Sequence, residues 1–218
     1  MHSKSLKNNI ETFHADNFQG LCDQLAKKDK SLRSIINTYG YPPMWTRPPG
    51  FATLIHIILE QQVSLASAKA AFVKLKERLV EITPAGLLAL TDEQMRACYF
   101  SRQKMAYARN LAQAIQVNDL NLVDMSGLPD EHVRFALKRI KGIGDWTADI
   151  YLIFALQRTN VFPIGDLAMV NAFKEVKKLD DGISKEELNN LSEIWSPHRS
   201  IATMLLWHYY IKKRGLIV

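Results

Sequence analysis

Two short stretches of this 218-residue chain, 137–149 and 162–166, carry residues whose types and spacing could do chemistry. The first, LKRIKGIGDWTAD, places two glycines around Ile143, between two helical patterns. Glycines permit a turn too tight for side chains, and the helix after it exposes unpaired backbone N–H groups at its positive end. Such a helix start binds a phosphate oxygen. The carbonyls of Lys138, Ile140 and Ile143 could hold an alkali cation, Na⁺ or K⁺, on the inner side of the turn.

The second stretch, FPIGD, ends on Asp166 just before an amphipathic helical pattern carried by Leu167, Val170 and Phe173. Aspartate is a preferred residue at a helix N-terminus, so Asp166 can be read as a cap alone. A carboxylate held there and facing a cleft can also stabilise an oxocarbenium-like sugar cation and orient or deprotonate a water. The residue types by themselves leave both readings open.

The hairpin pattern is more specific than its glycines, which an ordinary αα-hairpin would also explain. The pattern L-x-x-I-x-G-I-G-x-W-T-A, which begins at Leu137, resembles the helix-hairpin-helix of DNA repair glycosylases. FPIGD follows at the family's distance and resembles the Gly/Pro-rich loop that ends in the family's catalytic aspartate. The resemblance therefore implies that Asp166 is catalytic and that the chain acts on DNA.

Two further segments extend the resemblance. ILEQQVS at 58–64 resembles the segment that supplies the DNA-inserting residue, and WSPHRS at 195–200, followed by Trp207, resembles the C-terminal helix of the 3-methyladenine DNA glycosylase II family. Together the matches cover roughly residues 50–210. Some family members add an N-terminal antiparallel β-sheet domain, whereas residues 1–50 here read as helix and linker. The resemblance is therefore to the compact catalytic core.

The resemblance also assigns a base pocket. It implies that Trp146 and Trp207 line this pocket, although core packing is the alternative for each tryptophan. Aromatic faces attract an electron-poor, positively charged base. Ile150, one turn past Trp146, stands where some relatives carry a pocket tyrosine, so the pocket would be less aromatic and its range of lesions different.

DNA contacts are implied for a second set of residues. A flipped-out base leaves a gap that something must fill, and the resemblance makes Gln62 the inserted residue with Gln61 beside it. A surface cap at a helix end is the alternative for both glutamines. Asp149 could supply a charge near the site, and Arg199 could brace the last helix. The phosphate-binding residues implied are Gly142, Gly144, Trp146, Thr147 and Ser64.

The predicted reaction follows from what the site needs and lacks. An alkylated purine is already cationic and leaves as a neutral base, so one carboxylate suffices. Bifunctional relatives carry a lysine where Trp146 stands, and a lysine amine is what forms a Schiff base. We therefore predict a monofunctional DNA glycosylase of base excision repair that hydrolyses alkylated purines, of the 3-methyladenine and 7-methylguanine type, and leaves an abasic site. The alternatives are a glycosylase for mismatched, oxidised or deaminated bases, and a non-catalytic hairpin protein that binds distorted DNA.

The elements that must position these residues are helices. Apolar residues recur at helical spacing almost throughout, so we predict an all-α fold of roughly nine or ten helices. YPPMWTRPPG at 41–50 reads as a connector. We predict one glycosylase core, 1–218, in which two helical subdomains flank an active-site cleft: 51–141, ending in the hairpin, and 1–50 plus 142–218. Helix starts are predicted at capping boxes or at Pro in the first helical position: Ser184 with Glu187, Thr91 with Gln94, Thr83-Pro84 and Ser196-Pro197.

Composition agrees with a globular protein that meets a polyanion. Hydrophobic residues make up 47% of the chain and the net charge is +6, which fits double-stranded DNA containing alkylated bases as partner. Only Cys22 and Cys98 are present, so we expect a reduced intracellular protein without an iron-sulfur cluster. Apolar runs such as 150–156 are too short for a membrane span, and segment 1–18 lacks a secretory signal's apolar stretch. We expect a cytoplasmic, nucleoid-associated monomer if the source is prokaryotic, with no cofactor apart from the alkali ion.

Overall fold

The computed structural model describes residues 10–216, which form α-helices, two short 3₁₀-helices and one isolated β-bridge, without any strand. The α-helices in chain order are α1 (Ala15–Lys28), α2 (Lys30–Tyr39), α3 (Phe51–Glu60), α4 (Leu65–Arg78), α5 (Pro84–Leu88), α6 (Asp92–Ala97), α7 (Arg102–Gln116), α8 (Asp130–Lys138), α9 (Asp145–Phe154), α10 (Leu167–Lys177), α11 (Lys185–Ser192) and α12 (Arg199–Lys213). The 3₁₀-helices are η1 (Asp124–Gly127) and η2 (Glu193–Trp195). The predicted all-α class is confirmed. The polar segment 1–9 lies outside the described residues.

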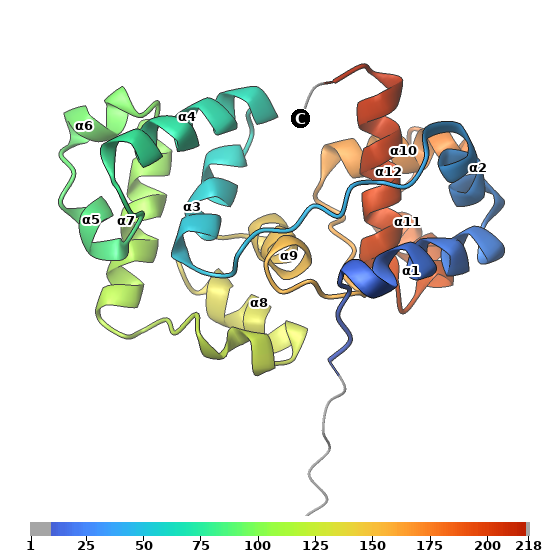
Figure 1. Cartoon of the computed structure of the whole chain (residues 1–218), viewed down its shortest axis with the longest axis horizontal. Coiled ribbons are helices and arrows are strands. Elements are labelled where there is room, and N and C mark those ends of the chain that lie inside the picture. The colour runs from blue at the N-terminus through green and yellow to red at the C-terminus, as the bar shows by residue number, and fades with distance from the viewer. Residues whose placement is uncertain (1–9, 217–218) are drawn as a thin grey trace, which may run out of the picture.

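The helices form two groups with α9 between them (Figure 1). In one group, α3 packs against α4 and α7, and α7 packs against α5 and α6. In the other, α12 packs against α1, α2 and α10. A linker from α2 to α3 crosses from one group to the other, as the proline-rich connector predicts. Helix α9 contacts α3 and α8, so the predicted division after residue 141, which stays a prediction, separates α9 from its packing partners.

Most helix starts follow the capping signals in the sequence. Both predicted capping boxes are present, with side chain and backbone bonded reciprocally at Thr91 and at Ser184, and Pro84 is the first residue of α5. The prediction for Ser196-Pro197 is wrong, because α12 begins later, at Arg199. The N–H of His198 donates to the Trp195 carbonyl at 2.7 Å, so Ser196 and Pro197 form a turn between η2 and α12.

The twelve α-helices in residues 10–216 exceed the predicted nine or ten, and one division that was not predicted is at Asp29, a single residue that separates α1 from α2. Its carboxylate caps α2 and accepts bonds from Lys177 Nζ at 2.6 Å and Trp195 Nε1 at 2.7 Å. Burial raises the pKa of Asp29, but the bonds from Lys177 and Trp195 outweigh it and hold this pKa below its usual value. A buried ion pair thus fastens the N-terminal helices to the C-terminal ones.

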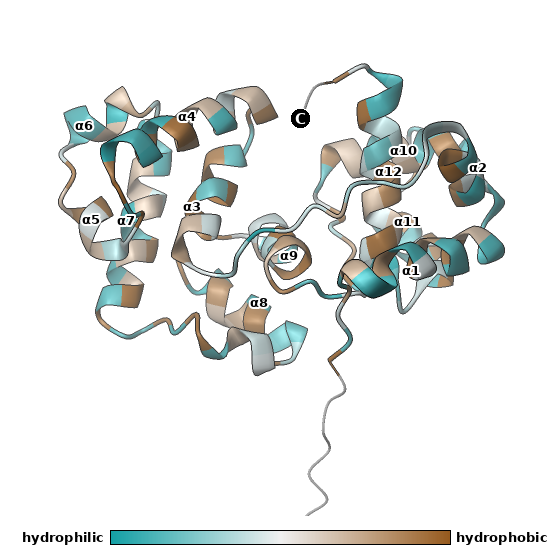
Figure 2. Cartoon of the chain, in the orientation of Figure 1, coloured by the Kyte–Doolittle hydropathy of each residue, from teal (hydrophilic) through white to brown (hydrophobic). Residues whose placement is uncertain are grey.

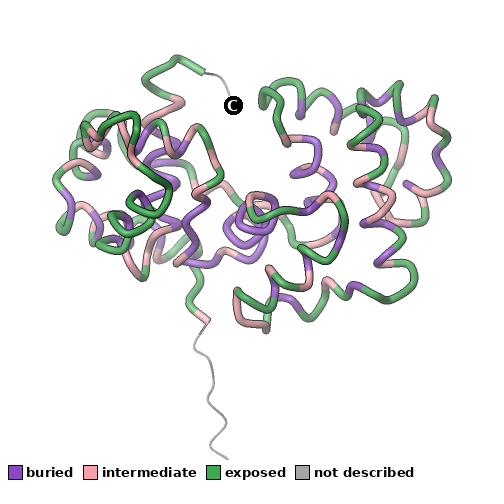
Figure 3. The backbone as a smooth tube through the Cα atoms, turned by 180° about the vertical axis from the view of Figure 1, so that it is seen from behind, coloured by how far each residue is buried: buried purple, intermediate pink, exposed green. Residues whose placement is uncertain are grey.

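Helix α9 is the centre of the molecule. Hydrophobic and hydrophilic colours alternate along most helices, as amphipathic elements require (Figure 2). Buried backbone concentrates at the middle, where α9 lies (Figure 3). Seven consecutive residues of α9, from Thr147 to Ile153, are buried. Within residues 10–216, no helix is long and apolar enough to cross a bilayer. The candidate residues at the start of α9 therefore sit on a firmly packed helix, as does Trp207 on α12, where the nine residues from Ser200 to His208 are all buried.

Candidate functional site

Asp166 is held by three hydrogen bonds at the start of α10. Its Oδ1 accepts from the Met169 N–H at 2.8 Å and from Trp207 Nε1 at 3.0 Å. Its Oδ2 accepts from Trp146 Nε1 at 2.9 Å. The side chain is therefore a helix cap and, at the same time, the meeting point of two indoles. Both carboxylate oxygens are fixed in one orientation before any ligand arrives.

The two tryptophans reach Asp166 from different helices. Trp146 lies in the first turn of α9 and is half-buried, whereas Trp207 lies near the middle of α12 and is 8% exposed. Their N–H edges meet the carboxylate. The Trp207 ring packs against Phe154, with 5.4 Å between ring centroids. Ile150 is only 2% exposed and belongs to the hydrophobic core.

The glycine turn between α8 and α9 is fixed by packing. Gly142 has φ +107°, and a Cβ there would lie 2.2 Å from the Tyr107 ring, so this position admits only glycine. Ile143, between the two glycines, is 5% exposed and anchors the turn. Asn110, on α7, donates a hydrogen bond to the Lys141 carbonyl at 3.1 Å. The turn is therefore held from below by α7.

The start of α9 is left open. Gly144 is the N-cap residue, is exposed, and has space around it, and no side chain caps this helix. Within the described residues, nothing accepts a hydrogen bond from the N–H groups of Asp145, Trp146 and Thr147. The Thr147 side chain is buried and accepts from Gln61. Only its backbone N–H remains available at this helix end, which is the arrangement that binds an anion.

The two glutamines of the α3–α4 turn, Gln61 and Gln62, point in different directions. Gln61 Nε2 donates to the Gly142 carbonyl at 2.9 Å and to Thr147 Oγ1 at 3.0 Å, which ties this turn to the hairpin. Gln62 is exposed with φ +56°. Ser64 caps α4 and is exposed beside it. Gln62, the residue expected to insert into DNA, thus faces outward, whereas Gln61, expected beside it, points inward and bonds to the hairpin.

The inner carbonyls of the hairpin are hard oxygen donors. The Ile140 carbonyl accepts from the Ile143 N–H at 3.0 Å. Within residues 10–216, no N–H meets the carbonyls of Lys138 and Ile143. Carbonyl oxygens without a donor suit a weakly coordinated alkali cation, so the residues present fit that ion.

Two weaker candidates are engaged in ion pairs. Asp149 accepts from Arg134 Nε at 2.8 Å, and its burial raises the carboxyl pKa above the usual value. Arg199 Nε donates to Asn160 at 2.8 Å, and its guanidinium also pairs with Glu193. Both residues therefore brace helices.

Sequence reasoning missed a second ion pair near the site, between Arg47 and Glu60. Arg47, in the linker, donates two hydrogen bonds to the Glu60 carboxylate, at 2.9 and 2.6 Å. Its guanidinium also lies 5.0 Å from the centroid of the Phe154 ring. The available signal was an arginine inside an otherwise proline-rich connector, YPPMWTRPPG.

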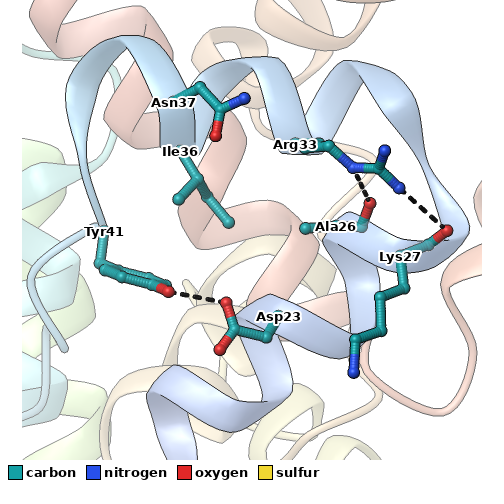
Figure 4. Close-up of a pocket in the computed structure, with 7 residues that line it drawn as sticks. All are labelled: Asp23, Ala26, Lys27, Arg33, Ile36, Asn37 and Tyr41. Atoms are coloured by element: carbon teal, nitrogen blue, oxygen red, sulfur yellow. Dashed lines mark hydrogen bonds between the residues drawn. The ribbon is translucent and has the colours of Figure 1, made fainter.

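Two surface hollows lie outside this arrangement. The hollow in Figure 4 lies between α1 and α2, where Tyr41 donates to Asp23 at 2.7 Å and Arg33 donates to the Ala26 carbonyl at 2.8 Å. Its polar groups thus bond to one another. The second is lined by residues of α3, α4, α7 and the turns that follow α3 and α6: Leu59, Val63, Ser67, Ala70, Ala71, Tyr99 and Lys104. Neither contains Asp166 or its tryptophans.

An all-α fold in which a glycine hairpin leads into a helix, and in which an aspartate begins the next helix, is typical of helix-hairpin-helix DNA repair proteins. The sequence model described as "HhH-GPD superfamily base excision DNA repair protein" matches residues 55–197. The chain belongs to this superfamily, and it is a base excision repair DNA glycosylase, an N-glycosyl hydrolase.

Three relatives show which members of the superfamily this chain is similar to. A DNA-3-methyladenine glycosylase of Schizosaccharomyces pombe is 30% identical over 183 residues, which cover 82% of this chain and 80% of that protein. The solved structure of a 3-methyladenine DNA glycosylase from the same yeast, in complex with abasic DNA, superposes with a TM-score of 0.77 at 27% identity, covering 86% of this chain and 95% of that one. An endonuclease III of Sulfolobus acidocaldarius is 32% identical over 171 residues, covering 76% of this chain and 72% of that protein. Within the superfamily the chain is thus similar to 3-methyladenine DNA glycosylases of the compact form.

Proposed function

We propose that this protein excises alkylated purines, of the 3-methyladenine and 7-methylguanine type, from double-stranded DNA. The observation that carries the proposal is the Asp166 carboxylate fixed between the Trp146 and Trp207 indoles. The names of the yeast relatives support the same substrate class. As the glycosidic bond breaks, positive charge develops on the sugar, and a fixed carboxylate stabilises it without reorganising. Asp166 then orients or deprotonates the water that attacks C1′.

The leaving base needs little help from the protein. A purine alkylated at N3 or N7 carries a positive charge and departs neutral, so no second acid is required to protonate it. Trp146 and Trp207 supply electron-rich rings on two sides of the carboxylate. Such rings favour a cationic base over a neutral one. Ile150 contributes apolar packing beneath Trp146.

Base flipping is assigned to the α3–α4 turn. We propose that Gln62, which is exposed, fills the gap left by the extruded base, whereas Gln61 holds the turn against the hairpin. The open N–H groups at Gly144, Trp146 and Thr147 grip the backbone of the same strand. A Na⁺ or K⁺ ion at the Lys138, Ile140 and Ile143 carbonyls would attract the same phosphate.

The reaction we propose stops at the abasic site. Cleavage of the backbone would require an amine that attacks C1′ and forms an imine. The position where bifunctional relatives carry a lysine holds Trp146, whose N–H is bonded to Asp166. The lone pair of an indole nitrogen belongs to the aromatic system, so this nitrogen cannot form an imine. We therefore assign hydrolysis without lyase activity.

The proposal is tested by incubating the protein with methylated duplex DNA and separating the released bases by chromatography. We expect 3-methyladenine and 7-methylguanine in the supernatant, and neither from the Asp166→Asn variant. The same assay is run on duplexes that carry an oxidised or a deaminated base, and release from these alone would favour the alternative glycosylase class. Tight binding to methylated DNA without any released base would mean a non-catalytic hairpin protein.

A further inference from the structure

The ion pair between Arg47 and Glu60 lies beside two packed rings of the site, Phe154 and Trp207, which we call the Phe154–Trp207 wall. The proposed reaction gives this ion pair no role. Arg47 and Glu60 form a bidentate ion pair whose side chains are 22% and 8% exposed. Glu60 is the last residue of α3, and Arg47 belongs to the linker. The Arg47 N–H donates to the Phe154 carbonyl at 2.8 Å, so the linker is fastened to the end of α9 at this point.

The pair connects to the catalytic carboxylate through two rings. The Arg47 guanidinium lies over Phe154, at 5.0 Å from the ring centroid. Phe154 packs on Trp207 at 5.4 Å, and Trp207 Nε1 bonds to Asp166 at 3.0 Å. A base whose sugar lies at Asp166 therefore approaches Trp207, one ring away from a guanidinium. That cation already occupies the kind of aromatic face that a cationic base would seek.

The other groups around Glu60 leave it as the counter-charge of Arg47. His56 Nε2 lies 3.7 Å from Glu60, but burial and the neighbouring Arg47 lower the pKa of His56 to about 4, so it is neutral. Lys104 Nζ donates to the Leu59 carbonyl, at the end of α3. Without the Glu60 carboxylate, the Arg47 guanidinium over Phe154 would lose its counter-charge.

We propose that Glu60 is a specificity-determining residue, which neutralises Arg47 so that a positively charged base can bind against the Phe154–Trp207 wall. The inference rests on the proposed function, because it concerns the charge of the base that the enzyme accepts. Arg47 positions Phe154, and Glu60 removes the electrostatic penalty of having Arg47 there. Removing either charge alone shifts selectivity, and the two shifts have opposite signs.

The test compares two duplexes that differ in the charge of one base. One carries 7-methylguanine and the other carries 7-methyl-7-deazaguanine, which has the same shape without the positive charge. Both bases are placed on a 2′-fluorinated sugar, which resists cleavage. The measured quantity is the ratio of the two dissociation constants. We expect Glu60→Gln to reduce the preference for the cationic base about tenfold and Arg47→Gln to increase it. The double variant should return to within about twofold of the wild-type ratio.

A matched control replaces the carboxylate of an exposed pair on α4. Glu77 pairs with Lys74 at 2.7 Å, and Glu77→Gln should leave the ratio unchanged. A purely structural Glu60 would weaken both duplexes equally, and that result overturns the inference, as does a double variant that keeps the Glu60→Gln ratio. If the wild type releases methylated bases but the ratio never changes, only this inference fails. If the wild-type protein releases no methylated base, the proposed function fails. The ratio of the two dissociation constants still tests whether Glu60 neutralises Arg47 beside the two rings.

Discussion

The loop at Asp166 and the hairpin before α9 use their hydrogen-bonding groups in opposite ways. Both oxygens of Asp166 are occupied, by Met169 and by two indoles. At the hairpin, the first N–H groups of α9 find no acceptor in residues 10–216, and Gly144 leaves open space around them. Under the proposed function, the group that acts on the substrate is thus fixed by the protein, whereas the groups proposed to bind DNA have hydrogen bonds left for the ligand to complete.

The largest effect should come from removing the charge at the occupied end. Asp166→Asn keeps an oxygen for the Met169 N–H but turns an NH₂ toward one indole N–H. We expect single-turnover release of methylated bases to fall about a hundredfold or more, because the developing sugar cation loses its counter-charge. Duplex affinity should hold or rise. A rate within about tenfold of wild type, with unchanged melting temperature, would remove Asp166 from catalysis.

A smaller loss is expected when one of the donors to Asp166 is removed. Trp207→Phe keeps an aromatic ring against Phe154 and deletes the N–H that bonds to Oδ1. A freer carboxylate should slow release about tenfold, the effect of one hydrogen bond to a charged group. Single-turnover kinetics on methylated duplex measure this. Trp195→Phe is a control, since its N–H bonds to Asp29 and not to the site. Equal losses in both variants would mean that folding, and not the carboxylate clamp, is affected.

At the open end, the informative change is Gly144→Glu, because a side chain there meets no other atoms. The new charge faces the phosphate site and should weaken binding about tenfold at low salt, equally for damaged and undamaged duplexes. Fluorescence anisotropy with both duplexes checks this. Gly142→Glu is a poor choice, since its Cβ would collide with Tyr107. Normal affinity of folded Gly144→Glu protein would show that the hairpin does not face DNA.

The last prediction is that borohydride, added during turnover, forms no protein-DNA crosslink. Borohydride added during turnover reduces an imine to a permanent protein-DNA crosslink. We expect released base without a crosslink, and strand breaks only after hot alkali, because Trp146 occupies the position of the lysine. A crosslinked band on a denaturing gel would contradict this expectation and would direct the search to another amine near Asp166.

The sequence predicts the parts of this molecule that local backbone chemistry determines. Glycine spacing locates the hairpin, and an aspartate before an amphipathic pattern locates the start of α10. Capping boxes mark α6 and α11 for the same reason, since cap and backbone are neighbours in the chain. Such features need no knowledge of distant contacts.

Long side chains that bond across the fold were not predictable. Nothing in the sequence tells Gln61 from Gln62, because the distinction depends on where the Gly142 carbonyl lies. Arg47 and Glu60 are separated by a linker and a helix, and their pairing follows from how α3 packs on α9. In the sequence, Asp29 is one of several charged residues in a polar stretch. Its bond from Trp195 depends on how the fold brings the two residues together. Residue spacing along the chain predicts hydrogen bonds between near neighbours, whereas the bonds of Gln61, Arg47 and Asp29 depend on how the helices pack.

The bond from Gln61 to the hairpin has a mechanical consequence. It joins the turn that carries Gln62 to the phosphate-facing turn, so the two form one unit. A duplex that touches both must adopt the spacing they impose, and the work of bending falls on the nucleic acid. Stiff, well-stacked duplex resists such bending, and a damaged base pair yields at lower cost. If the proposed function holds, the resistance of each base pair to deformation would be sensed before any base reaches Trp146 and Trp207.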